Sequence, residues 1–297
     1  MGARRTPPVA RRNHAGRPPL TFSLHVEVDG SGLPLLLLPT FASGAESWGG
    51  AVVRTLADRF LVLRLDWPGI GRSPPFPGGS LSVDAVAQAV LTAAGRHTDA
   101  PLRVLGWGLG AMVALRLAAD RPERVEHLVL IGGAAHSGAL LAAAPTVAAL
   151  CCVSDTASAE EHMLGFLGRL TSPAWRPFAE MFLVQLLPRP ARVLAALQSQ
   201  WAALPAYDLR SSLDRVRSPT LLLVGDVDAL APPKLARELQ ASMPSARLHT
   251  IAGAGHAAIW EQPGAVLDEV LTFLGGDGDD IETGIPRQRT VVKGRKF

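Results

Sequence analysis

The residues best suited to chemistry stand at the ends of short apolar runs. Residues 104–110 read VLGWGLG and precede a helix-like pattern, so they predict a buried strand, a sharp turn and a helix. Asp226 and Asp228 follow a second apolar run, and His256 follows a third. Gly108 occupies the first turn and has no side chain that could attack a carbonyl. Ordinary acyl-enzyme catalysis is therefore not expected at this position.

The elements that must position these residues follow an alternating pattern. Short apolar runs alternate with longer amphipathic stretches, which is typical of a mostly parallel sheet flanked by helices. The sequence thus predicts an α/β fold. The predicted strands are residues 22–28, 33–38, 60–65, 102–106, 127–131, 220–224 and 247–251. The predicted helices are residues 48–58, 83–94, 109–119, 234–242 and 264–273.

The pattern also divides the chain into a core, an insertion and two tails. Residues 136–218 contain helical patterns and no convincing strand, so we expect a helical cap over the strand ends. Residues 20–135 and 219–275 then form the core. The tails, 1–19 and 276–297, are poor in core-forming residues and are expected to be disordered.

Between about residues 20 and 275, the chain resembles the α/β-hydrolase family. The resemblance rests on motifs in the family's order: an oxyanion-loop segment, a glycine-rich turn, the nucleophile elbow, and the turns that deliver the acid and the histidine. In this sequence they are residues 35–41, 66–73, 104–110, 223–232 and 253–263. The family's elbow reads Gly-x-Ser-x-Gly, and Gly108 replaces its serine.

This resemblance implies a catalytic pair, His256 and Asp228, with Asp226 as the fallback acid. Asp228 would accept the Nδ1 proton of His256 and leave Nε2 free as a general base. Gly108 would be a vacant nucleophile position, with space for a substrate atom or a water molecule. Asp66, in the glycine-rich turn, is assigned no chemistry.

An altered oxyanion hole is also implied. Its donors would be the backbone N–H groups of Phe41 and Leu109, neither of which requires the serine. The family usually has His-Gly where this chain has Pro39 and Thr40, so the loop differs from the family pattern.

A largely apolar ligand is expected beneath the cap, because ligands of open α/β sheets bind beyond the carboxyl ends of the strands. Most large apolar residues of the cap are expected to pack against the core. Some must face the cleft, and the partner is expected to be an apolar small molecule or peptide. The residues expected to bind it are Thr40, Trp107, Trp175, Phe178, Phe182 and Trp260.

These features suit three functions. The leading hypothesis is a non-hydrolytic, cofactor-independent enzyme that uses the base and the oxyanion hole for epimerisation, isomerisation, cyclisation or elimination on a carbonyl compound. A first alternative is hydrolysis of an ester, thioester or ketone by water that His256 activates. A second alternative is a ligand-binding protein without catalysis. The alanine- and arginine-rich composition is typical of GC-rich bacteria, in which such relatives often serve natural-product pathways.

Composition narrows the list of partners. The net charge is +3, and the basic excess lies in the tails, so no nucleic-acid site is predicted. No apolar stretch is long enough to span a membrane, so a cytoplasmic protein is expected. Cys151 and Cys152 are neighbours, which disfavours a disulfide, and no metal-ligand spacing occurs. No cofactor is expected, and the oligomeric state stays open.

Overall fold

The computed structural model describes residues 22–76, 82–143, 166, 168–179, 190–243 and 245–275. The tails predicted to be disordered lie outside these residues, as do Phe182 and the two cysteines.

A seven-stranded sheet forms the centre of the described structure, in the order β1-β3-β2-β4-β5-β6-β7. β1 pairs antiparallel with β3, and every other pairing is parallel, which confirms the predicted α/β fold. The strands are β1 (Val26–Asp29), β2 (Leu33–Leu38), β3 (Phe60–Leu65), β4 (Leu102–Trp107), β5 (Val125–Ile131), β6 (Thr220–Gly225) and β7 (Arg247–Ile251).

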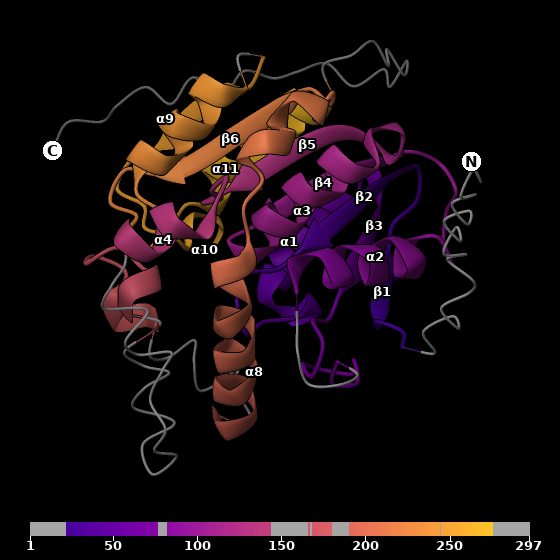
Figure 1. Ribbon diagram of the computed structural model, residues 1–297, viewed down its shortest axis with the longest axis horizontal. Coiled ribbons are helices and arrows are strands. Elements are labelled where there is room, and N and C mark those ends of the chain that lie inside the picture. The colour runs from indigo at the N-terminus through magenta and orange to yellow at the C-terminus, as the bar shows by residue number, and fades with distance from the viewer. Residues whose placement is uncertain are drawn as a thin grey trace, which may run out of the picture.

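Helices cover the sheet, as expected for parallel strands that are apolar along their whole length. All residues of β4 and β6 are buried. α2 packs beside α3 on the side of the sheet that faces the viewer in Figure 1, and α1 contacts α11. The core helices are α1 (Gly50–Ala57), α2 (Val83–Ala94), α3 (Leu109–Asp120), α9 (Pro233–Ser242), α10 (Ala258–Glu261) and α11 (Pro263–Leu274).

Several predicted boundaries differ from the structure by one to four residues, and local contacts explain two of the differences. The first strand begins at Val26 instead of residue 22, because the preceding residues make other contacts: the His25 N–H donates to Ser73 Oγ, and Phe22 packs edge-on against Phe76. α1 begins at Gly50 instead of residue 48, because a 3-10 turn, η1 (Ala45–Trp48), precedes it.

Helical segments occupy the described parts of the interval between β5 and β6. They include α4 (Ser137–Ala143), α8 (Pro190–Ala203) and the 3-10 turns η4 (Leu204–Ala206) and η5 (Arg210–Arg215), and residues 168–170 and 176–179 are also helical. α8 projects beyond the strands (Figure 1). The buried Tyr207 hydroxyl donates to the carbonyl of Ala134, just after β5, at 3.1 Å. Burial raises the pKa of Tyr207 far above its usual range, so its hydroxyl remains a donor.

The glycine-rich turn after β3 is a structural brace. Asp66 accepts hydrogen bonds from the N–H groups of Ala45 and Arg72, each at 2.9 Å. Ser73 Oγ donates to the carbonyl of Asp66 at 2.8 Å. Gly71 has a φ of 51°, and an added Cβ there would collide with the Asp66 carboxylate. These bonds support the expectation that Asp66 has no chemical role.

The start of α3 lies against the end of β2 with no space for a side chain. A Cβ added at Gly110 would overlap the Leu38 carbonyl oxygen and stand 2.7 Å from that of Pro39. We predict that Gly110→Ala lowers the free energy of unfolding by about 3 kcal/mol or more, because backbone atoms must shift. Urea unfolding measures this change. Gly264→Ala is the control, since no atom lies within 4 Å of its added Cβ, and it should be neutral or slightly stabilising. Equal stabilities of the two variants would contradict the close approach.

Candidate active site

The turn between β4 and α3 has the geometry of a nucleophile elbow. Its single residue, Gly108, has φ 57° and ψ −113°, a conformation that L side chains rarely adopt. The Gly108 N–H donates to the carbonyl of Ile131 at 2.9 Å, and the Gly110 N–H donates to that of Pro39 at 3.1 Å. The elbow is thus fixed to the ends of the neighbouring strands.

His256 and Asp228 form a buried pair beside this elbow. His256 Nδ1 lies 2.9 Å from Asp228 Oδ2, and each side chain is 1% exposed. Asp228 Oδ1 accepts hydrogen bonds from the N–H groups of Leu230 and Ala231 at 2.8 and 2.7 Å. Since an ionised carboxylate can only accept, the Nδ1 proton belongs to His256 and Nε2 is left as the basic atom.

Asp226, the alternative acid, lies in a different environment from Asp228. Asp226 Oδ1 accepts the N–H of Gly253 at 2.8 Å, and its residue is exposed. Asp228 therefore pairs with His256, and Asp226 stabilises the loop that leads to His256.

Several groups hold the histidine loop in place. Trp107 Nε1 donates to the His256 carbonyl at 2.8 Å. Glu261 accepts the N–H of Gly255 with one carboxylate oxygen and the N–H of Ser172 with the other, each at 3.0 Å. The Glu261 carboxylate thereby ties the histidine loop to the inserted segment, and sequence reasoning noted Glu261 only as part of a motif.

The space expected at Gly108 is occupied. A Cβ added there would collide with Thr40 Oγ1 and lie 2.8 Å from His256 Nε2. The expectation that the lost serine side chain leaves room for a water molecule is therefore wrong for this conformation. The Thr40 hydroxyl and the His256 imidazole occupy that volume.

The proposed oxyanion donors lie on two fixed segments. Leu109 is the first residue of α3, so no carbonyl of its own helix can accept its N–H. Phe41 precedes Ala42, the one described non-glycine residue with a positive φ, 53°. The Ala42 N–H donates to Gln200 Oε1 at 2.6 Å, and this bond stabilises the strained loop.

The residues predicted to bind substrate fall into different environments. Thr40 lies at the centre of the site, next to His256. Trp107 is fully buried and packs edge-on against Trp260, and its ring centroid lies 6.3 Å from that of His256. It therefore supports the histidine and does not form an open wall. Trp175 and Phe178 pack against each other in the inserted segment, and Phe178 is 55% exposed.

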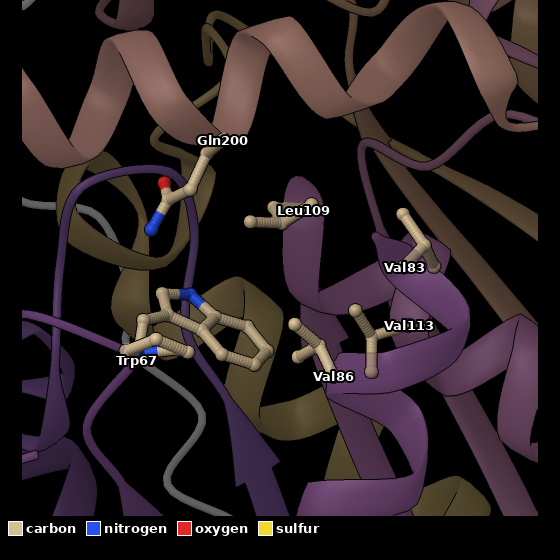
Figure 2. A pocket seen from close by; sticks show the side chains of 7 residues that line it. Trp67, Val83, Val86, Leu109, Val113 and Gln200 are labelled. Atoms are coloured by element: carbon tan, nitrogen blue, oxygen red, sulfur yellow. The ribbon is translucent and has the colours of Figure 1, made fainter. Parts of the chain in front are cut away.

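An apolar pocket that sequence reasoning missed lies beside the elbow (Figure 2). Gln200 of α8 closes one side of it, and its Nε2 has no hydrogen-bond partner within the described part of the chain. The gaps between the lining side chains are too narrow to admit water, so the pocket is closed in this conformation. No local pattern marks these residues, because they come from separate elements. The lining residues are Trp67, Pro68, Val83, Val86, Leu109, Val113 and Gln200.

Comparisons with known proteins agree with the fold. Residues 34–263 match the model of a family described as the alpha/beta hydrolase fold. The pimeloyl-[acyl-carrier protein] methyl ester esterase of Aeromonas hydrophila is 30% identical over 263 residues, which cover 86% of this chain and 100% of that relative. The protein of the same name from Nitrosomonas europaea is 30% identical, with 81% of this chain and 95% of the relative covered.

Solved structures extend the comparison. A hydrolase from Pseudomonas aeruginosa has a TM-score of 0.72 and 30% identity, and the match covers 87% of this chain and 100% of the other. The α/β-hydrolase MGS-M2, from a deep-sea metagenome library, has a TM-score of 0.77 at 20% identity, with 87% and 96% covered. The second likeness concerns the fold alone.

These relatives change the order of the functional hypotheses. The leading expectation from the sequence, a non-hydrolytic reaction, finds no support among them, and neither does a role in natural-product pathways. The esterase names favour the first alternative, hydrolysis. Among the helices that the structure describes, none is long and apolar enough to cross a membrane.

The His256–Asp228 pair, here called the dyad, has room only because a glycine, Gly132, directly follows β5. A Cβ added at Gly132 would lie 2.6 and 2.7 Å from His256 Cε1 and Nδ1. We predict that Gly132→Ala displaces the imidazole and lowers ester turnover about 10²-fold, as misplaced catalytic groups do. Steady-state kinetics on p-nitrophenyl acetate measures the loss.

The matched control is Gly253→Ala. Gly253 also has a positive φ, 72°, but no atom lies within 4 Å of its added Cβ. Both variants bear a backbone strain of about 1–2 kcal/mol, and only Gly132→Ala crowds the dyad. Equal turnover in the two variants would contradict the assigned role of the His256 position.

Proposed function

Because this chain belongs to the α/β-hydrolase fold family, we propose that it hydrolyses the ester or thioester of an apolar acyl compound. The observation that carries the proposal is the buried His256–Asp228 pair, whose Nε2 stands beside the elbow with no partner among the described residues. A buried basic nitrogen without a partner costs free energy, and a catalytic role is one reason for a native structure to keep such an atom.

In this proposal, His256 accepts the proton of the O–H group that attacks the carbonyl carbon. Asp228 orients the imidazole and stabilises the imidazolium that forms. The N–H groups of Phe41 and Leu109 donate to the oxyanion of the tetrahedral intermediate. The imidazolium then gives its proton to the leaving alcohol or thiol, and water supplies the second oxygen of the product acid.

The proposed acyl site is the apolar pocket in Figure 2, because Leu109 is both a lining residue and the expected oxyanion donor. The pocket is closed to water in this conformation, so an acyl chain enters it only when the lining side chains move apart. An acyl chain bound there would begin at the elbow and extend between α2, α3 and α8. The names of the relatives support an acyl ester as the substrate class. Gln200 Nε2 offers one donor in otherwise apolar surroundings, and it would suit a polar atom along the chain.

The dyad is tested by removing each partner. We predict that His256→Ala lowers kcat/KM for p-nitrophenyl butyrate about 10²–10⁴-fold, the usual contribution of a general base. Asp228→Asn should cause a comparable loss, because the wrong tautomer of His256 is then favoured. His249→Ala is the control, since that imidazole is exposed and pairs with Glu269. Unchanged turnover in His256→Ala would refute the proposed function.

The substrate site is tested on α2, where two buried valines lie one turn apart. Val86 lines the pocket and Val90 does not. We predict that Val86→Ala shifts the preferred p-nitrophenyl ester to a longer acyl chain, because it widens the pocket. Val90→Ala should lose similar stability, about 1–3 kcal/mol, without this shift. A common chain-length profile for both variants would place the acyl group elsewhere.

A further inference from the structure

Two polar atoms at the centre of the site lack hydrogen-bond partners among the described residues: Thr40 Oγ1 and His256 Nε2. Both residues are 1% exposed, so solvent does not satisfy these atoms. Both atoms also crowd the same point, the position that a Cβ on Gly108 would occupy. A hydroxyl and a basic nitrogen thus converge where the elbow serine would stand.

The backbone around Thr40 is fixed, so this convergence follows from the loop's own bonds. Trp67 Nε1 donates to the carbonyls of both Pro39 and Thr40, at 3.0 and 2.9 Å. The Gly110 N–H also donates to the Pro39 carbonyl, which ties the loop to α3. With the backbone held from two sides, the short Thr40 side chain is confined beside His256.

Other hydroxyl groups of the same loop have different partners. Ser43 Oγ donates to the Thr40 carbonyl at 2.9 Å, and Ser47 Oγ donates to the Gly44 carbonyl at 2.7 Å. Gly108 offers no hydroxyl. Of the hydroxyls in this loop, the Thr40 hydroxyl is therefore the one left to give its proton to His256.

We propose that Thr40 Oγ1 is the nucleophile that His256 activates, and that it replaces the missing elbow serine from the opposite loop. This inference rests on the proposed hydrolysis. The Thr40 hydroxyl gives its proton to His256 Nε2 while its oxygen bonds to the acyl carbon, and the carbonyl electrons pass to the oxyanion. The oxyanion collapses, the bond to the leaving alcohol breaks, and the alcohol takes the proton from the imidazolium.

Water completes the reaction. It gives a proton to His256 Nε2 and attacks the acyl-threonine ester, and the Thr40 oxygen leaves with that proton. The enzyme returns to its starting state, and the product is the free acid. Without a substrate, Thr40 and His256 do not yet form a hydrogen bond. Such bonds often tighten only in the complex with substrate.

Two substitutions separate this role from a packing role. Thr40→Val keeps the shape of the side chain and removes the hydroxyl, whereas Thr40→Ser keeps the hydroxyl and removes a methyl group. We predict that Thr40→Val lowers turnover of p-nitrophenyl acetate at least about 10³-fold, as loss of a nucleophile does, and that Thr40→Ser stays active. Thermal unfolding of both variants shows whether each remains folded.

Covalent labelling of the unaltered protein gives a second, independent readout. A fluorophosphonate probe should add one adduct, and peptide mass mapping should place it on Thr40. His256→Ala should not be labelled, because the hydroxyl then has no base. Thr92→Val, on the exposed face of α2, is the control and should be labelled like the unaltered protein.

The outcomes distinguish this inference from the proposed function. If Thr40→Val hydrolyses esters normally while His256→Ala does not, water attacks directly, and the inference fails although the function stands. If Thr40→Val is inactive but no adduct forms on Thr40 in the unaltered protein, the nucleophile role also fails. If His256→Ala keeps full activity, the proposed function itself is wrong. Should Thr40→Val not fold, the mapped adduct alone decides.

Discussion

The buried hydrogen bond between His256 and Asp228 is the interaction on which the site depends. A buried carboxylate is stable only if hydrogen bonds replace its lost hydration. Asp228 receives two of these from the backbone of Leu230 and Ala231, and the third from the imidazole. Gly132 leaves room for the pair, and Trp107 holds the carbonyl of His256. Residues at the ends of β4, β5 and β6 thus hold His256 Nε2 in position.

Close packing at the elbow places Thr40 beside Gly108. The strained conformation of Gly108 persists because the ends of β4 and β5 hold it. With no side chain there, Thr40 from the loop after β2 occupies the adjacent volume. A hydroxyl missing from the elbow in the sequence is therefore not missing from the site.

This packing and the relatives together favour hydrolysis over the non-hydrolytic reaction that the sequence suggested first. That hypothesis assumed an empty space at Gly108 and a base without a hydroxyl to act on. The Thr40 side chain occupies that space, and the relatives that match most of this chain are named as esterases. A general base, two backbone donors and a nearby hydroxyl are together consistent with hydrolysis.

The sequence by itself determined the strands, most of the core helices and the order of the motifs, because apolar periodicity and glycine-marked turns are local properties. Strand bounds such as 33–38 and 60–65 could be predicted to the residue. The motifs also implied that His256 pairs with Asp228, with Asp226 as the fallback acid. The tertiary structure placed Asp226 away from this pair, and it decided that Thr40 fills the space beside Gly108 and that Gln200 closes the apolar pocket. These are contacts between residues far apart in the chain, and they depend on how the loops pack, which no local pattern records.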